Sequence, residues 1–133
     1  MIFVTGGTGL LGSHLLFQLT SEGKSVRAIY RNFDAISRVQ KLFDFYNPSA
    51  SKQLFSLIEW KACDVLDVIT LEEEMTGCTQ VYHCAATVSF RRKHFHSMLK
   101  INREGTANMV NIALTLPIEK FCFVSSTAAV AKD

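Results

Sequence analysis

The residues best suited to chemistry form a glycine-rich segment near the start of the chain, Thr5-Gly6-Gly7-Thr8-Gly9-Leu10-Leu11-Gly12. It contains G-x-G-x-x-G from Gly7 and G-x-x-G-x-x-G from Gly6. Glycine permits the backbone angles of a tight strand-to-helix turn, and its missing Cβ lets a pyrophosphate approach the main chain. Free N–H groups at the start of the following helix then bind negative charge. The segment predicts a dinucleotide-binding loop, and the absence of a following Gly-Lys-Ser/Thr excludes a P-loop.

Two further residues bear on which dinucleotide would bind. Arg31 follows the second expected strand, at the place where an acidic residue would hold both ribose hydroxyls of NAD. An arginine can instead pair with the 2′-phosphate of NADP and stack on adenine, so we favour NADP over NAD; the alternative is a solvated surface arginine. Asp64 ends the third expected strand, where its carboxylate could accept a hydrogen bond from adenine, or could simply cap a helix.

Short apolar runs alternate with helical periodicity along the chain. The expected strands cover residues 1–5, 25–30, 57–65, 81–85 and 121–125. The expected helices cover residues 10–22, 34–46, 52–56, 70–76 and 96–116, with Asp34 and Thr70 as candidate caps. This alternation predicts an α/β protein with a Rossmann-type doubly wound parallel sheet in three layers. By analogy with such folds, the strand order would be 3-2-1-4-5.

Length and composition narrow the class of protein. A chain of 133 residues with 48% hydrophobic and 20% charged residues fits one globular domain, and a net charge of +2 does not suggest a nucleic-acid surface. No signal peptide or membrane span is visible, so we expect a cytoplasmic protein. The four cysteines show no C-x-x-C or zinc spacing, and most are interpreted as small buried apolar residues. His94 and His96 lack a third ligand and predict no metal site.

The residues after the fourth expected strand allow two interpretations. Arg91, Arg92 and His94 would lie at the carboxyl edge of the sheet, where they could touch substrate or cofactor. The alternative is a solvated helix start or loop. Trp60 and Tyr82 are expected in the core.

Five segments together resemble the extended short-chain dehydrogenase/reductase family, also called the NAD-dependent epimerase/dehydratase family. They are residues 5–12, Cys63-Asp64-Val65-Leu66-Asp67, Val81-Tyr82-His83-Cys84-Ala85-Ala86, Asn102-Arg103-Glu104-Gly105-Thr106-Ala107-Asn108 and Phe123-Val124-Ser125-Ser126-Thr127. The resemblance implies that the loop glycines line the pyrophosphate and that Asp64 and Val65 meet adenine. It also implies that Cys84, Ala85 and Ala86 pass beneath the ribose and pyrophosphate. Asn102 corresponds to a structural asparagine at the cofactor site, or could be an exposed residue at the start of a helix. Val124 and Ser125 would lie near the nicotinamide.

The family resemblance also implies a catalytic arrangement. A Ser or Thr orients the substrate, and a Tyr-x-x-x-Lys about 25 residues later supplies the acid/base. Thr127 best matches the hydroxyl position and Ser126 is the alternative, although both could be ordinary strand-end hydroxyls. No Tyr-x-x-x-Lys follows before Asp133. We therefore interpret residues 1–133 as the NAD(P)-binding Rossmann domain of a longer enzyme, inactive alone because it lacks the substrate-binding part.

The expected function is hydride transfer on an alcohol, carbonyl or nucleotide-sugar substrate, with NADP preferred to NAD. The alternative is a non-catalytic NAD(P)-binding sensor or scaffold on the same fold. The expected partner is a small-molecule substrate, without nucleic acid or membrane, and the full-length protein could form a homodimer.

Overall fold

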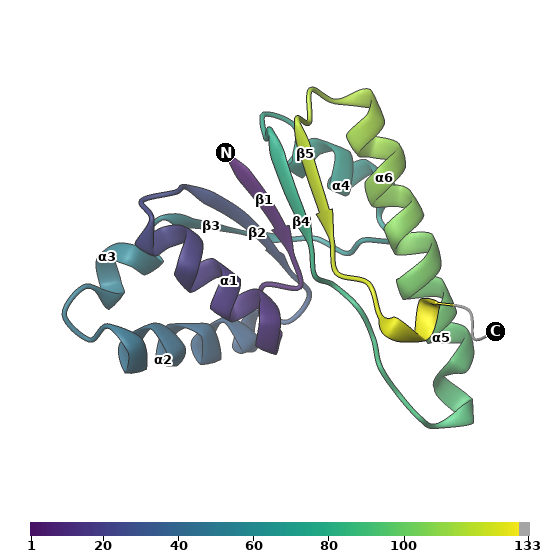
Figure 1. The fold of residues 1–133 in the computed structure, drawn as a ribbon, viewed down its shortest axis with the longest axis horizontal. Coiled ribbons are helices and arrows are strands. Elements are labelled where there is room, and N and C mark those ends of the chain that lie inside the picture. Colours follow the sequence, from purple (N-terminus) through teal and green to yellow (C-terminus); the bar gives the residue numbers. More distant parts are fainter. Residues whose placement is uncertain (131–133) are drawn as a thin grey trace.

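A computed structural model describes residues 1–130, and the strands in this part of the chain form one parallel sheet. They are β1 (Ile2–Thr5), β2 (Val26–Tyr30), β3 (Ile58–Ala62), β4 (Gln80–His83) and β5 (Lys120–Phe123). Their order, β3-β2-β1-β4-β5, confirms the predicted Rossmann-type fold and strand order (Figure 1). Because the order reverses beside β1, the connections after β1 and β4 leave the sheet toward opposite faces and open a crevice between them.

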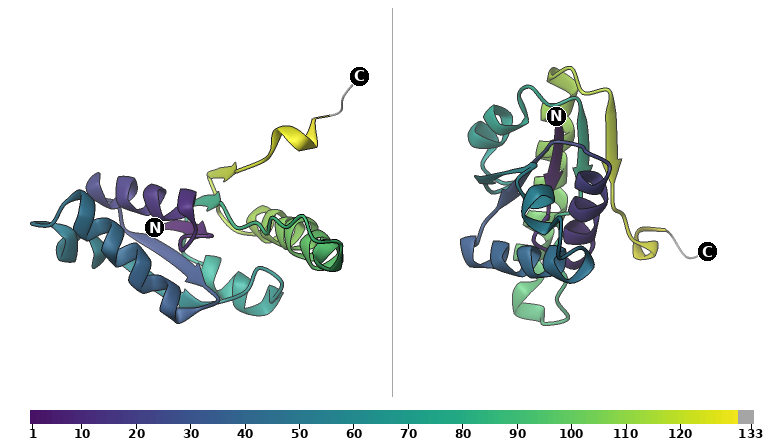
Figure 2. Two further views of the ribbon diagram at one scale, coloured as in Figure 1. Left: turned by 90° about the horizontal axis from the view of Figure 1, so that it is seen from below. Right: turned by 90° about the vertical axis from the view of Figure 1, so that its left-hand side faces the viewer.

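Helices cover both faces of the sheet and give the three predicted layers (Figure 2). One face carries α1 (Leu10–Ser21), α2 (Ile36–Tyr46) and α3 (Ser51–Phe55). The other carries α4 (Val68–Met75) and α6 (Thr106–Thr115), and α5 (Phe95–Leu99) extends beyond the sheet below α6 (Figure 1). Alternation along the strands feeds two cores: Val4 packs with the first group, whereas Phe3 packs with the second.

The long helix expected over residues 96–116 is helical but not uniform. A π-helical segment, η3 (Lys100–Gly105), separates α5 from α6. At its end the backbone lies close to the loop after β3, because a Cβ on Gly105 would meet Val65 Cγ2 at 2.6 Å. Sequence periodicity does not reveal such an insertion, since π-helical turns arise from packing and occur often near functional sites.

Two predicted caps were wrong, and the expected ends of β3, β4 and β5 lay two or three residues too far along the chain; β4 ends at His83 and β5 at Phe123. Asp67, not Thr70, caps α4, and its carboxylate accepts hydrogen bonds from the backbone N–H and the hydroxyl of Thr70. Asn32, not Asp34, caps the short 3₁₀ helix η1 (Phe33–Ala35) that precedes α2. β3 ends at Ala62 instead of residue 65. At both helix starts, a polar residue two or three positions before the predicted cap accepts the hydrogen bond from the helix backbone.

The cysteines differ from one another in exposure. Cys63 and Cys78 are buried as expected, Cys84 is half-buried and Cys122 is exposed, so fewer cysteines are buried than predicted. Burial raises the pKa of the Cys63 thiol to about 12, so this thiol is inert at neutral pH. Trp60 and Tyr82 pack against the core beneath α1 and α2, as predicted. None of the helices within residues 1–130 is long and apolar enough to cross a membrane.

Candidate dinucleotide-binding site

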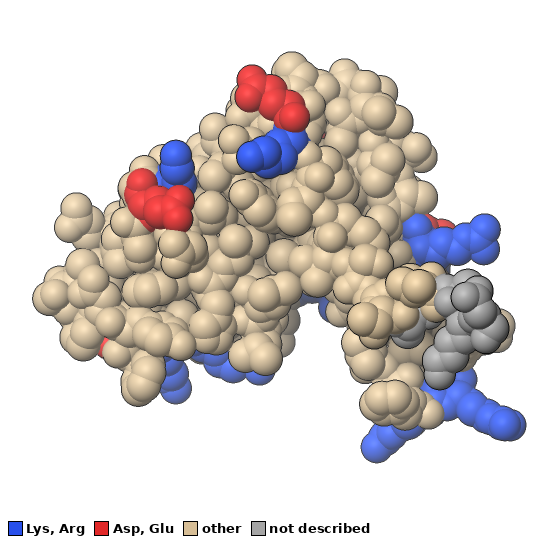
Figure 3. Space-filling model, in the orientation of Figure 1, with Lys and Arg blue, Asp and Glu red and all other residues tan. Residues whose placement is uncertain are grey.

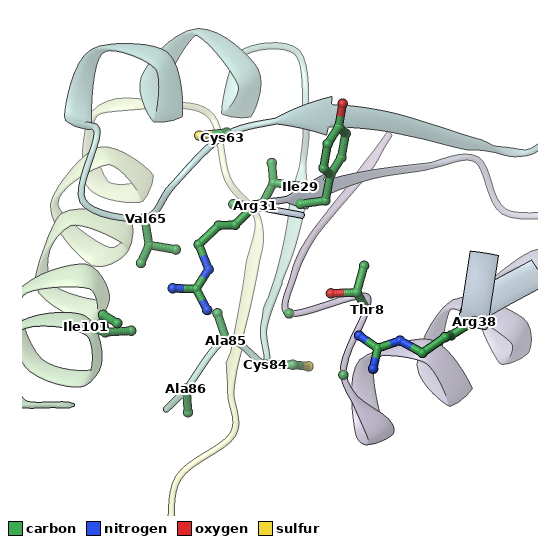
Figure 4. Close-up of a pocket in the computed structure, with 13 residues that line it drawn as sticks. Thr8, Ile29, Arg31, Arg38, Cys63, Val65, Cys84, Ala85, Ala86 and Ile101 are labelled. Atoms are coloured by element: carbon green, nitrogen blue, oxygen red, sulfur yellow. The ribbon is translucent and has the colours of Figure 1, made fainter. Parts of the chain in front are cut away.

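A cavity of about 300 Å³ opens at the carboxyl edge of the sheet, in the crevice beside β1 (Figure 4). Its walls come from the loop after β1, the end of β2, the connections after β3 and β4, one residue of α2 and one residue of η3. The lining residues are Gly6, Thr8, Gly9, Ile29, Tyr30, Arg31, Arg38, Cys63, Val65, Cys84, Ala85, Ala86 and Ile101. Ligands of open α/β sheets bind at this kind of switch point.

The glycine-rich loop has the close approaches that the motif predicts. Gly6 has a φ of +70°, and a Cβ there would lie 2.6 Å from Ala85 N and from Cys84 C. A Cβ on Gly12 would overlap the carbonyl oxygen of Gly6, so this position brings α1 against the loop. Gly9 N donates to Gly6 O across 3.0 Å. The loop is therefore a tight turn that only glycine can form at two of its positions.

The start of α1 presents backbone N–H groups to the cavity edge. Gly9 is the cap residue, no side chain caps this end, and the first turn carries no acidic residue. The first N–H groups of a helix have no intrahelical acceptor, so those of Leu10 and Leu11 remain for an anion. Leu10 and Leu11 are 83% and 55% exposed and do not line the cavity, so their contact with a cofactor stays a prediction.

Two guanidinium groups reach the cavity. Arg31 follows β2 and extends toward Ala85, whereas Arg38 comes from α2 and extends toward Thr8 (Figure 4). Arg31 was predicted from its place after the strand. Arg38 lies seven residues after Arg31 on a helix and belongs to no motif, so it was not identified from the sequence. The available signal was helical periodicity, which buries Val39 and exposes Arg38.

The connection after β3 forms the opposite wall. Val65 is buried and lines the cavity, and its carbonyl oxygen accepts a 3.0 Å hydrogen bond from Asn108 Nδ2 on α6. The carboxylate of Asp64 accepts from Leu66 N at 3.0 Å and shapes the turn, but Asp64 is not among the cavity-lining residues. Asn108 thus anchors this wall to the helix layer.

A buried hydrogen-bond network lies directly beneath the cavity floor. Ala85 N donates to Thr5 Oγ1 at 3.1 Å, and Thr5 Oγ1 lies 2.6 Å from His83 Nδ1. The other ring nitrogen, Nε2, lies 2.9 Å from Thr106 Oγ1 on α6. A neutral imidazole donates from one ring nitrogen and accepts at the other, so one of these two threonine hydroxyls donates to His83 and the other accepts from it.

Burial keeps this histidine neutral. His83 is 1% exposed, and desolvation lowers its pKa to about 4. The ring also stacks on Phe123 with centroids 5.5 Å apart. His83 therefore connects β1, the floor at Ala85, β5 and α6. Thr5 was predicted as a cofactor-binding residue and acts here through Ala85; His83 was not singled out, because nothing local in the sequence indicates its burial.

The segment after β4 is held in place by Asn102. Asn102 Nδ2 donates to Thr87 O at 2.9 Å, and Thr87 N donates to Asn102 Oδ1 at 2.8 Å. The segment that precedes Thr87, Cys84-Ala85-Ala86, forms the cavity floor. The asparagine lies in η3, outside the cavity lining, so its contact with a bound cofactor stays a prediction while its positioning role is visible.

The predicted residues around β5 lie apart from this cavity. Val124 N donates to His83 O at 3.1 Å, and Val124 and Ser125 are exposed. Ser126 and Thr127 follow, with Thr127 beginning the 3₁₀ helix η4 (Thr127–Ala129). None of these four lines the cavity, although all lie beyond the carboxyl end of a strand adjacent to β4.

The family assignment follows from comparison with known proteins. A family model described as "NAD dependent epimerase/dehydratase family" matches residues 2–133. The chain belongs to this family. It is 32% identical over 128 residues to a putative dihydroflavonol 4-reductase of Synechocystis sp., covering 96% of this chain and 33% of that protein.

Two further similarities agree. A ketoreductase of Stigmatella aurantiaca, named for 4-hydroxy-2-methyl-3-oxo-4-farnesyl-3,4-dihydroquinoline-1-oxide, is 34% identical over 131 residues, covering 97% of this chain and 34% of the relative. The crystal structure of Pen from Bacillus thuringiensis aligns with a TM-score of 0.80 at 26% identity, covering 97% of this chain and 39% of that one. The chain thus spans about a third of the length of these curated relatives.

Proposed function

We propose that this chain is the NADP(H)-binding part of an oxidoreductase that transfers hydride to or from an alcohol or carbonyl substrate. The observation that carries the proposal is the cavity at the switch point, which combines the glycine-rich loop with two arginines. The resident dinucleotide would supply the hydride-accepting or hydride-donating nicotinamide. The reductase names of the relatives support a carbonyl compound as substrate in preference to a nucleotide sugar.

Different residues of the chain would bind different parts of the cofactor. Gly6, Gly9 and the start of α1 would bind the pyrophosphate through main-chain N–H groups, where the helix dipole favours negative charge. Val65 would pack against adenine at the wall that Asn108 anchors. Ala85 and Ala86 would leave room beneath the ribose, since their side chains are small.

The two arginines would select NADP over NAD. Arg31 and Arg38 reach the cavity from different elements, and a 2′-phosphate between them would be paired from two sides. No carboxylate lies among the cavity-lining residues to bind the two hydroxyls of an NAD ribose.

The hydroxyl groups after β5 would act on the substrate side. We infer that Thr127, or Ser126 in its place, would donate a hydrogen bond to the substrate oxygen during hydride transfer. None of the tyrosines, Tyr30, Tyr46 and Tyr82, has a lysine four residues later. The proton donor would therefore come from outside residues 1–133.

Calorimetric titration with NADPH and NADH tests the proposal. We expect tighter binding of NADPH, with Arg31→Ala and Arg38→Ala each weakening NADPH about tenfold or more, as expected for loss of a charge-assisted hydrogen bond, while NADH binding changes little. Lys24→Ala, on an exposed residue before β2, is the matched loss of charge and should change neither affinity. Equal affinities for the two dinucleotides would refute the role of the arginines but leave dinucleotide binding standing. A folded chain that binds neither would refute the proposed function.

A further inference from the structure

Residues 87–103, here called the cationic arm, combine exposed apolar and basic side chains that the cofactor cavity does not use. Phe90 is 100% exposed and Val88 is 81% exposed. The sequence has no Asp or Glu between Glu74 and Glu104, so nothing acidic lies within the arm. Its basic residues are Arg91, Arg92, Lys93, Lys100 and Arg103.

The positive charge of the arm is not neutralised within residues 1–130. The ion pairs in that part of the chain join Arg27 and Lys61 to Glu59 and Glu74, far from the arm in the sequence and on other elements. Figure 3 shows Lys and Arg side chains projecting from the end of the molecule that carries α5. Such a concentration of one sign of charge attracts anionic ligands.

The arm is folded around a hollow. Phe90, Arg91, Arg92, Phe95 and Met98 are among the residues that surround an open space of about 360 Å³. Ser89 shapes this space, because its N–H donates to Met98 Sδ at 3.1 Å and its hydroxyl lies 2.8 Å from His94 Nδ1. The 3₁₀ helix η2 (Arg92–His94) then turns the chain into α5. The space is an open surface groove, and Phe90 at its rim is fully exposed.

The arm is also continuous with the cofactor cavity. It starts immediately after Ala86, which lines that cavity, and Ile101 near its end lines the cavity as well. The paired hydrogen bonds between Asn102 and Thr87 join the two ends of the arm. The segment that forms the hollow therefore begins and ends beside the proposed cofactor site.

We propose that the cationic arm is a substrate subsite for an apolar or aromatic carbonyl compound that carries an anionic group, a carboxylate or a phosphate. This inference rests on the proposed function. Arg91 and Arg92 would pair with the anion, because guanidinium groups bind carboxylate and phosphate through forked hydrogen bonds. Phe90 and Phe95 would cover the apolar body. An anionic membrane also offers negative charge and apolar groups, but the arm directly follows the floor of the cofactor cavity in the chain, and this favours a small molecule.

A matched pair of probes tests the charge requirement. 5-Phenylpentanoate and 5-phenylpentanamide share a shape and differ in charge, and each would be titrated by NMR into the 1–133 chain saturated with NADPH. We expect the carboxylate to shift backbone amides in residues 87–103 and to bind at least threefold more tightly than the amide. The double variant Arg91→Gln/Arg92→Gln should lose this preference. Lys24→Gln/Lys52→Gln, with the same change of charge on exposed residues elsewhere, should keep it.

Each outcome decides between the alternatives. Three results would overturn the subsite: equal binding of the two probes, a preference that survives in the Arg91/Arg92 double variant, or shifts outside the arm. In each case NADPH binding would leave the proposed function intact. Carboxylate binding by a chain that binds no dinucleotide would overturn the proposed function and with it the assignment to a substrate. Sedimentation with phosphatidylcholine vesicles with and without phosphatidylglycerol covers the membrane case. If the chain binds vesicles only with the anionic lipid and both arginines, and does not bind the carboxylate, the arm is a membrane-binding site and the proposed substrate subsite is wrong.

Discussion

His83 is neutral in the folded protein because burial lowers its pKa from the ordinary 6.5 to about 4. Unfolding exposes the imidazole and restores the higher value. Between these two pKa values the unfolded chain binds more protons, so the stability that this group confers is complete above pH 6.5 and is lost as the pH falls toward 4. We expect the free energy of unfolding to decrease by up to about 1.4 kcal/mol per pH unit in this window on account of His83.

Urea unfolding at pH 7, 6 and 5 would measure this effect. His83→Asn should flatten the dependence on pH above 5, although the variant is less stable at pH 7 because two buried hydrogen bonds change. His96→Asn, on an exposed histidine, should preserve the slope. The resolved shifts of Asp44, Glu59 and Asp67 lower their pKa values from 3.8, 4.5 and 3.8, so the stability that these three groups confer is lost mostly below pH 5, outside this pH range. An unchanged slope in His83→Asn would contradict the buried neutral imidazole.

Gly12 offers a second test at the level of one atom. A Cβ at this position would overlap Gly6 O, whereas one at Gly9 would lie 3.3 Å from the same atom. Overpacking of this kind typically costs about 1–3 kcal/mol. We therefore expect Gly12→Ala to lower the free energy of unfolding by about that amount, with Gly9→Ala the milder variant in this measurement, whereas both substitutions should weaken NADPH binding. Equal effects of the two substitutions on stability would show that the contact with Gly6 O does not limit the loop.

Elements could be predicted from the sequence where local pattern and tertiary packing agree. The strand–glycine–helix unit over residues 1–22 followed from its motif, because apolar residues, turn residues and helix start coincide there. The π-helical η3 did not, since it depends on the approach of Gly105 to Val65 from a distant loop. The same holds for the site: the loop glycines and Arg31 have local signatures, whereas Arg38 and His83 become significant only through the packing of α2 and β4.

η3 also carries the clearest prediction about an element. Asn102 holds Thr87 by two hydrogen bonds, so Asn102→Ala should free the start of the cationic arm without unfolding the sheet. Hydrogen exchange at the Thr87 amide should become about tenfold faster, the change that loss of about 1.4 kcal/mol of local stability produces. Asn111→Ala, on an exposed face of α6, is the matched control and should leave that amide unchanged. Unaltered exchange in Asn102→Ala would mean that other contacts hold the segment.

At the scale of the whole molecule, the proposed cofactor site lies between the two halves of the sheet, which are β2 with β3 on one side of β1 and β4 with β5 on the other. Its walls include Arg31 after β2 on one side of β1 and Ala85 after β4 on the other. A ligand that binds only the folded state stabilises it by about 2.7 kcal/mol at a concentration one hundred times its Kd. Since the ligand would contact both halves, they should gain this stability together.

We therefore expect NADPH at that concentration to raise the free energy of unfolding by about 2.7 kcal/mol in urea titrations followed by fluorescence of Trp60, which lies in the core beneath α1 and α2. Hydrogen exchange at Ile29 on β2 and Val81 on β4 should slow by the same factor, because the two strands belong to one stabilised unit. The Arg31→Ala/Arg38→Ala variant at the same NADPH concentration should gain much less, as its Kd is higher. Protection confined to β2 would show that the dinucleotide engages only one half of the sheet, and would remove Ala85 and Ala86 from the proposed site.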